Sequence, residues 1–308
     1  MSPRAAGPPA DAVTVSRVFD GYARVERFDA VGSTNDVVRA WLAEGTPEPC
    51  VAIADHQTAG RGRNGRSWSA PAGAALLVSI GFRPRWLDVE DSWRLAAITA
   101  LAMADAAEDV AGLAEGTIRL KWPNDLVAII GGEDAVLVGD MSAEAALARR
   151  SGGLDVRKIA GVLGETEGLG TLDPRAIIGI GVNADWAAAD FPVELAGSMS
   201  SLREISGGRP IDRDALLDGF LGRLETRTEA LRGGRFDVAG WTDRQLTTGH
   251  VVEIAGLDGS RVTALALGVD GASGALVVEV IDPNGGSEER HVLAGEVARL
   301  RLRSASVV

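Results

Sequence analysis

The chain has 308 residues, 46% of them hydrophobic, and a formal net charge of −12 at pH 7. This length suffices for one large domain, or for a medium domain joined to a small one. The acidic balance argues against a broad nucleic-acid-binding face, and no apolar run is long enough to predict a membrane-spanning helix.

The first part of the chain predicts a flexible tail, a strand and a helix. Residues 1–20 show no periodicity and lack the apolar segment of a signal peptide. Residues 22–28 are typical of a strand. Ser33 stands three residues before Asp36, a spacing similar to a capping box, and an apolar stripe follows, which predicts a helix.

A buried strand is predicted at residues 50–54, and it leads into a loop that concentrates positive charge. Residues 60–66 hold three arginines and three glycines. Glycines let backbone N–H groups approach an anion, and arginine forks fit phosphate or carboxylate oxygens. The sequence therefore predicts an anion-binding loop, followed by a second buried strand at residues 74–82.

The loop also matches the glycine spacing of the dinucleotide-binding fingerprint, through Gly60, Gly62 and Gly65. That motif requires a helix directly after the loop, with its N-terminus facing the pyrophosphate. Here the chain continues through Pro71 and Gly73 into a strand. We therefore expect arginines and backbone groups to hold the anion.

Cys50 is the only cysteine, so no internal disulfide can form and a cytoplasmic location is predicted. The three histidines lie far apart in sequence, which disfavours a zinc site made of Cys and His. A Mg²⁺ ion that arrives on phosphates needs few protein ligands and stays compatible with this composition.

The rest of the chain predicts an α+β domain over residues 21–246 and a small β-rich domain over 247–308. Short β-runs separated by turns from residue 250 onward are typical of a small barrel. The segment 131–153 is predicted to be an inserted surface loop with a short helix at 142–150. The other predicted elements are a helix at 91–110, strands at 117–120, 158–163 and 176–182, and a helix at 211–231.

Taken one at a time, the polar motifs have structural explanations. Ser33 to Asn35 could serve only as a helix cap, residues 60–68 as a solvated turn, and residues 123–125 as a turn after a strand. Lys158 alone would be a solvated charge. The occurrence of all of them in one chain, in one order, favours a functional interpretation.

In this order the motifs resemble the biotin–protein ligase family. The resemblance rests on residues 32–35, 57–68, 121–125, 158–163 and 179–183, and the Gly-Arg block together with Lys-Trp-Pro-Asn-Asp is specific for it. It implies an α+β fold, with a mixed-sheet catalytic domain of the biotin/lipoate ligase type and a small C-terminal SH3-like β-barrel. About 20 residues precede the first predicted strand, so we expect the enzyme-only form without an N-terminal DNA-binding domain.

The resemblance implies ATP-dependent activation of biotin to biotinyl-5′-AMP, followed by transfer of biotin to a lysine of a biotin carboxyl carrier protein. The implied cofactors are ATP and Mg²⁺. The implied partner is the carrier domain of a biotin-dependent carboxylase, with no nucleic acid and no membrane. The sequence leaves monomer and homodimer open.

The resemblance also implies roles for individual residues. Arg61, Lys121, Asp125 and Lys158 are expected to be catalytic, and Asp125 is the expected metal ligand. Lys121, Asn124 and Asp125 would serve ATP. The residues expected to bind biotin or its adenylate are Ser33, Thr34, Asn35, Gln57, Arg61, Gly62, Arg63 and Lys158, and Gly60, Arg66, Trp68, Gly161 and Asn183 complete the predicted binding set.

Two alternatives remain at this point. A lipoate-type ligase would share the fold and the adenylation step, although the Gly-Arg loop and Trp122 to Asp125 favour biotin. A biotin-sensing protein without turnover is the second, and the presence of Lys121, Asp125 and Lys158 argues against it. We further expect residues 60–68 to become ordered over the adenylate and to exclude water from it.

Overall fold

The strands and helices were traced in a computed structural model, which describes residues 12–13, 19–130, 155–256, 259–281, 287–293 and 296–301. The chain divides into two units, Met1–Trp86 with Leu163–Val182, and Leu87–Val162 with Asn183–Val308. The predicted insertion 131–153 and its helix lie outside the described residues. Among the helices of the described part, none is long and apolar enough to span a membrane.

The first unit is built on a mixed β-sheet. β2 (Arg24–Val31) and β3 (Cys50–Gln57) are parallel, with helix α1 (Thr34–Ala43) as the crossover between them. β4 (Ala75–Phe82) pairs antiparallel with β3, and β8 (Arg175–Asn183) follows β4 in the sheet order. Within the predicted tail, β1 (Ala12–Val13) pairs with β2.

The core of the first unit lies between α1 and the sheet. All eight residues of β4 are buried, as the predicted apolar run required. The apolar stripe of α1 contributes Val38, Trp41 and Leu42, which pack with buried residues of β2, β3 and β8. The helix that carries the predicted binding residues at its N-terminus is therefore fixed against the sheet.

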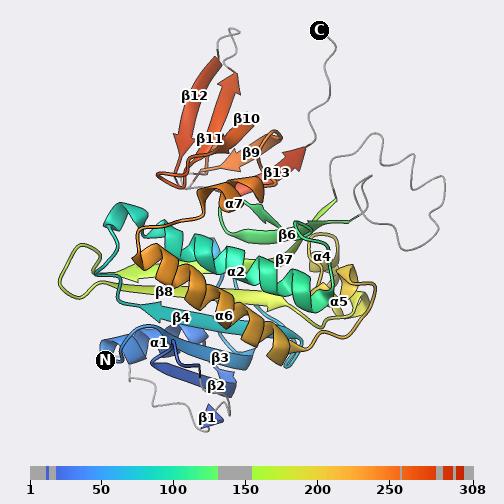
Figure 1. Cartoon of the computed structure of the whole chain (residues 1–308). Coiled ribbons are helices and arrows are strands. Elements are labelled where there is room, and N and C mark those ends of the chain that lie inside the picture. The colour runs from blue at the N-terminus through green and yellow to red at the C-terminus, as the bar shows by residue number, and fades with distance from the viewer. Residues whose placement is uncertain are drawn as a thin grey trace, which may run out of the picture. The chain divides into compact units, whose positions relative to one another are not determined.

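The second unit contains a three-stranded antiparallel array and a pair of long helices. β5 (Arg119–Lys121) pairs with β6 (Asp125–Ile129), and β6 pairs with the first part of β7 (Val156–Glu167). Helices α2 (Trp93–Ala111) and α6 (Arg213–Arg232) lie side by side in Figure 1, and Arg227 on α6 forms a 2.7 Å ion pair with Asp105 on α2. The shorter helices are α4 (Val193–Ala196), α5 (Leu202–Ile205) and α7 (Val238–Asp243).

The β-rich end forms a separate antiparallel sheet in the order β12-β11-β10-β9-β13. Its strands are β9 (Val251–Ala255), β10 (Arg261–Val269), β11 (Leu276–Ile281), β12 (Ser287–Val292) and β13 (Glu296–Arg301), seen at the orange and red end of Figure 1. The predicted fold class, an α+β mixed-sheet domain with a small β-rich C-terminal domain, is confirmed.

One local prediction is wrong. Ser33 does stand at the N-cap of α1, but its hydroxyl makes no capping hydrogen bond. The carboxylate of Asp36 does not complete a capping box either, because Arg39 and Arg61 bind it. The carboxylate that the sequence spacing assigned to the helix cap therefore forms ion pairs with two arginines that lie outside the first turn of α1.

Candidate functional site

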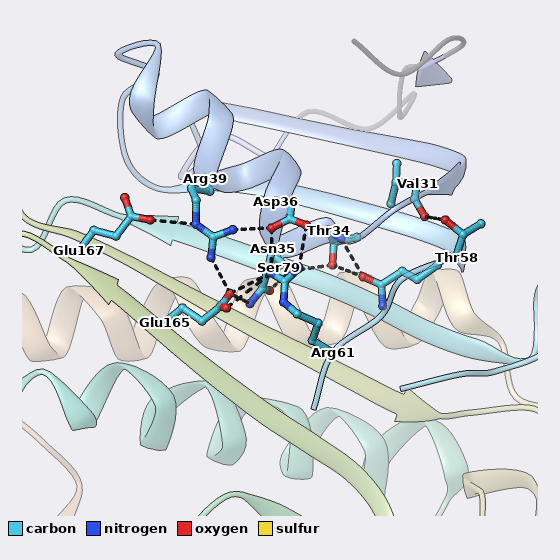
Figure 2. Close-up of polar contacts among 11 residues, drawn as sticks. Val31, Thr34, Asn35, Asp36, Arg39, Thr58, Arg61, Ser79, Glu165 and Glu167 are labelled. Atoms are coloured by element: carbon cyan, nitrogen blue, oxygen red, sulfur yellow. Dashed lines mark hydrogen bonds and ion pairs between the residues drawn. The ribbon is translucent and has the colours of Figure 1, made fainter. Parts of the chain in front are cut away.

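A row of buried polar groups lies at the N-terminus of α1 (Figure 2). The backbone N–H and the hydroxyl of Thr34 both donate to Oε1 of Gln57, at 2.7 and 3.0 Å. These residues meet because Val31 at the end of β2 is in register with Gln57 at the end of the parallel strand β3. Residues of two motifs that are 23 positions apart in the sequence are therefore in contact.

The row continues through Asn35 to two residues that the sequence did not predict. The hydroxyl of Ser79 on β4 lies 2.5 Å from Oδ1 of Asn35 and 2.7 Å from the hydroxyl of Thr34. Nδ2 of Asn35 donates to Oε2 of Glu165 on β7, at 2.5 Å. Ser79 is a lone hydroxyl in an otherwise apolar buried strand, and that was the signal available in the sequence.

Ser79 gives this row an alternative set of hydrogen bonds. Its hydroxyl carries one hydrogen and has two acceptors in range, Asn35 and Thr34. When Ser79 donates to Asn35, the hydroxyl of Thr34 can donate to Ser79, and Gln57 then receives only the backbone N–H of Thr34. The row can thus rearrange its protons without moving a side chain.

Two glycines on β8 make room for these side chains. A Cβ atom at Gly179 would overlap Oδ1 of Asn35, and a Cβ atom at Gly181 would lie 2.7 Å from the indole ring of Trp68. Residues two apart on a strand face the same side. Gly179 and Gly181, in the motif at residues 179–183, therefore leave the space on β8 that Asn35 and Trp68 occupy.

The Gly-Arg loop forms a tight hairpin. The carbonyl of Gly60 accepts from the N–H of Trp68 at 2.9 Å, and the N–H of Gly62 donates to the carbonyl of Arg66 at 2.7 Å. A turn with positive φ at Asn64 (55°) and Gly65 (73°) closes it. After the loop the chain enters strand β4 rather than a helix, which confirms that it is no dinucleotide-binding turn.

Within this hairpin, Arg61 is tied to helix α1 by ion pairs. Nη1 and Nη2 of Arg61 donate to the two carboxylate oxygens of Asp36 at 2.7 and 2.8 Å, and Nη2 lies 3.4 Å from Glu165 (Figure 2). Arg39 also binds Asp36, and it reaches Glu165 and Glu167 at 2.9 Å each. The hydrogen bond from Arg61 lowers the pKa of the Asp36 carboxyl and raises the pKa of the guanidinium in turn.

Arg63 also lies in the hairpin, in the turn Arg63–Gly65. The predicted residues of the second unit form a second group. Lys121 ends β5 and pairs in register with Asp125, which begins β6. Nζ of Lys158 on β7 lies 2.6 Å from Oδ1 of Asp125, and Gly161 is the register partner of Asp125. Nδ2 of Asn124 donates to the carbonyl of Val162 at 2.8 Å, which fixes the turn before β6 on β7.

Asn183 joins this group through one intermediate residue. Its Nδ2 donates to the carbonyl of Ser200 at 3.1 Å, and the N–H of Ser200 donates to the carbonyl of Lys158 at 3.0 Å. Asn183 is buried. Asn183 therefore fixes the backbone at Ser200, which hydrogen-bonds to the backbone of Lys158.

The strand that carries Lys121 is held by the chain that enters the C-terminal sheet. The N–H of Leu120 donates to the carbonyl of Arg244, and the N–H of Leu246 donates back to Leu120, both at 2.8 Å. The N–H of Trp122 donates to Oγ1 of Thr247 at 3.0 Å. The Trp122 side chain is buried in the hydrophobic core of the C-terminal sheet.

The described side chains could hold a metal ion only together with a bound ligand that supplies further donor atoms. Among the described residues, no group of three or more His, Cys, Asp or Glu side chains could hold a metal. Asp125 offers one carboxylate, and Lys158 already contacts one of its oxygens. This fits Mg²⁺, which commonly takes one or two carboxylates and completes its shell with phosphates and water.

Comparison with known proteins gives consistent matches. The model of the family described as "Biotin/lipoate A/B protein ligase family" matches residues 28–183. The chain is 30% identical to a Mycobacterium tuberculosis "Biotin--[acetyl-CoA-carboxylase] ligase" over 283 residues, 91% of each protein. It is 28% identical over 199 residues to the "Bifunctional ligase/repressor BirA" of Bacillus subtilis, covering 65% of this chain and 52% of that protein.

The fold is also found among solved structures. The "Biotin protein ligase from Aquifex aeolicus in complex with biotin and ATP" matches with a TM-score of 0.65 and 22% identity, over 89% of this chain and 97% of that one. A Leishmania major biotin protein ligase in complex with biotinyl-5-AMP matches with a TM-score of 0.54 and 21% identity, over 89% and 99% of the two chains. At these identities the likeness concerns the fold.

Proposed function

The chain belongs to the biotin/lipoate A/B protein ligase family, and we infer that it is a biotin–protein ligase. In the first step, a carboxylate oxygen of biotin attacks the α-phosphorus of ATP, and pyrophosphate leaves as the α–β phosphoanhydride bond breaks. In the second step, a lysine amine of a carrier protein attacks the acyl carbon of biotinyl-5′-AMP. An amide forms, AMP leaves with the oxygen of the mixed anhydride, and the amine gives up its proton.

The buried polar row at the N-terminus of α1 is the observation that carries this function. The ureido ring of biotin offers a carbonyl acceptor and two N–H donors, and Thr34, Asn35 and Gln57 offer matching groups. The dithiolane ring of lipoate offers no such groups. A site built to hydrogen-bond a ligand discriminates strongly against an analogue that lacks the partner atoms, so the row favours biotin over lipoate.

The ion pair of Lys158 with Asp125 supports adenylation. Bringing the carboxylate of biotin to the phosphates of ATP places two anions together, and the transition state spreads negative charge over phosphoryl oxygens. Lys121 and Lys158 supply cations from adjacent positions around Asp125. A Mg²⁺ ion bound to the ATP phosphates would neutralise further charge, with Asp125 as its protein ligand.

We also propose the carrier and the compartment. A lysine on a biotin carboxyl carrier domain is the acceptor that the first step prepares for, because a free amine forms a stable amide from the mixed anhydride. ATP and such carriers share the cytoplasm, where Cys50, the only cysteine and a buried one, needs no disulfide partner.

Labelling of a purified biotin carboxyl carrier domain by biotin and ATP tests the function. We expect label on the carrier only when both substrates are present, and no label on a lipoyl domain supplied with lipoate. Lys158→Ala and Arg61→Ala should lower the rate, whereas Arg85→Ala, at a side chain that is 63% exposed, should leave it unchanged. Biotin binding without label on any carrier would identify a sensor and refute the ligase.

A further inference from the structure

The guanidinium fork of Arg61 faces a carboxylate of its own chain. Its two terminal nitrogens each meet one oxygen of Asp36, at 2.7 and 2.8 Å (Figure 2). This is the bidentate geometry with which arginine binds carboxylate and phosphate ligands. An adenylate phosphate that took the same two N–H groups would have to displace Asp36.

Displacing Asp36 from Arg61 should cost little free energy, because Arg39 contacts both carboxylates that Arg61 would leave, those of Asp36 and Glu165. Arg39 is itself bound to Asp36 and lies 2.9 Å from Glu165. When Arg61 turns away, each of these carboxylates keeps a cationic partner. The side chains of Asp36 and Arg61 are also 51% and 36% exposed, so water solvates both after separation and lowers the cost of separating them.

We propose that Asp36 is an internal competitor for Arg61, which an anionic ligand must displace, and that Asp36 thereby sets the affinity for the adenylate. The proposal rests on the proposed function, since biotinyl-5′-AMP is the ligand. When a fraction of the protein has its binding group engaged elsewhere, the apparent dissociation constant rises by the inverse of the competent fraction. For a solvent-exposed pair this corresponds to a factor of about two to five.

A positioning role for Asp36 predicts the opposite change in ligand affinity. If Asp36 instead held Arg61 in the position that the ligand requires, removing the carboxylate would weaken binding, because the guanidinium would become disordered. The sign of the change in affinity therefore separates competition from positioning. A change that does not depend on Arg61 would reveal only a general charge effect.

The test compares three ligands that share the biotin ring: neutral biotin methyl ester, biotin, and a non-hydrolysable biotinyl-adenylate. Competition titration would measure their dissociation constants on the wild-type chain, Asp36→Asn and Asp36→Ser. We expect both variants to bind the two anionic ligands about two- to fivefold more tightly and the ester unchanged. Equal or weaker adenylate binding by the variants would overturn the proposal.

Two controls test whether the change in affinity depends on the guanidinium of Arg61. Glu167→Gln removes a negative charge from the same network at a residue that contacts Arg39, and it should leave all three constants unchanged. In an Arg61→Ala background, Asp36→Asn should have no effect, and a persistent gain would count against competition. If the wild-type chain bound neither biotin nor its ester, the proposed function would fail as well, whereas normal wild-type binding without tightening in the variants refutes only the competitor.

Discussion

Nε1 of Trp122 donates a hydrogen bond to the backbone carbonyl of Gly274, at 3.1 Å. Trp122 belongs to the motif that carries Lys121 and Asp125, and Gly274 lies in the turn between β10 and β11 of the C-terminal sheet. A Cβ atom at Gly274, where φ is +73°, would lie 2.7 Å from the ring of Trp93, so only glycine fits this turn. The side chain of Trp122 thus joins the proposed ATP-side motif to the core of that sheet.

Replacing Trp122 should destabilise the chain. Trp122→Ala removes a side chain that is 4% exposed, and we expect the free energy of unfolding to fall by about 3–5 kcal/mol. Trp122→Phe keeps most of the apolar contact but leaves the carbonyl of Gly274 without this donor, so it should cost less, about 1 kcal/mol for the hydrogen bond, plus a smaller loss of packing. Urea unfolding would measure both, and equal losses would contradict this assignment.

The two glycines of β8 should not tolerate alanine. In Gly179→Ala the new methyl group meets Oδ1 of Asn35, and in Gly181→Ala it meets Trp68. We expect KM for biotin to rise by about five- to 160-fold, the equivalent of about 1–3 kcal/mol of overpacking. Gly164→Ala is the matched control, because its methyl group would lie at an ordinary 3.5 Å from Ile178. Similar kinetics for all three variants would refute the role of Gly179 and Gly181 in making room for Asn35 and Trp68.

Loss of Lys158 should slow adenylation more than it weakens biotin binding. One removed charge-stabilising group typically costs about 2.7–4 kcal/mol of transition-state stabilisation, so Lys158→Ala should lower the rate about 100- to 1,000-fold. Pyrophosphate release would report it. Arg157→Ala, one position earlier on β7, removes a side chain that binds Asp155 and Glu204 instead and should leave this rate near the wild-type value.

Cys50 should make stability fall at alkaline pH. Burial raises the pKa of its thiol from the ordinary value of 9.0 to about 11. Between these values the unfolded chain loses the thiol proton and the folded chain keeps it, so the free energy of unfolding decreases as pH rises from 9 to 11 and levels off above. The expected contribution is at most about 3 kcal/mol. It should vanish in Cys50→Ala, and parallel stability curves for the two proteins would disprove it.

The hairpin of residues 60–68 should be protected by its ligand. Trypsin can cut after Arg61, Arg63 and Arg66, and we expect biotinyl-5′-AMP to slow these cuts because the loop closes over the adenylate. Cleavage after the exposed Arg85 serves as the internal reference. Equal cleavage of the loop with and without the adenylate would contradict the predicted ordering.

Much of the fold follows from local patterns. β3 begins with five buried apolar residues, β4 is apolar except for Ser79, and α1 has an apolar stripe with helical spacing, so these patterns identify all three elements. β6 was missed because it begins directly at Asp125, in a segment whose Pro and Asn indicated a turn. β13 falls within the predicted β-rich end, but no bounds were predicted for it, because its alternation with arginines resembles an exposed end of the chain.

The site was predictable only where its residues form sequence motifs. Thr34 and Gln57, which belong to two of the motifs, are in contact in the structure. Ser79 and Glu165 were not predicted, because their place beside Asn35 depends on which strands become neighbours in the sheet. The ion pair of Arg61 with Asp36 was not predicted either, since Asp36 had a sufficient local explanation as a cap residue.

The bonds that hold Leu120 and Trp122 limit how this protein can be divided. Leu246 and Thr247 bind the backbone of that strand, and the ring of Trp122 fills the core of the sheet that follows. A chain truncated after residue 246 would lose the hydroxyl of Thr247 and expose an indole ring to water. Exchanging the C-terminal sheet between relatives should therefore succeed only when the tryptophan, the threonine and the turn glycine are transferred as a set.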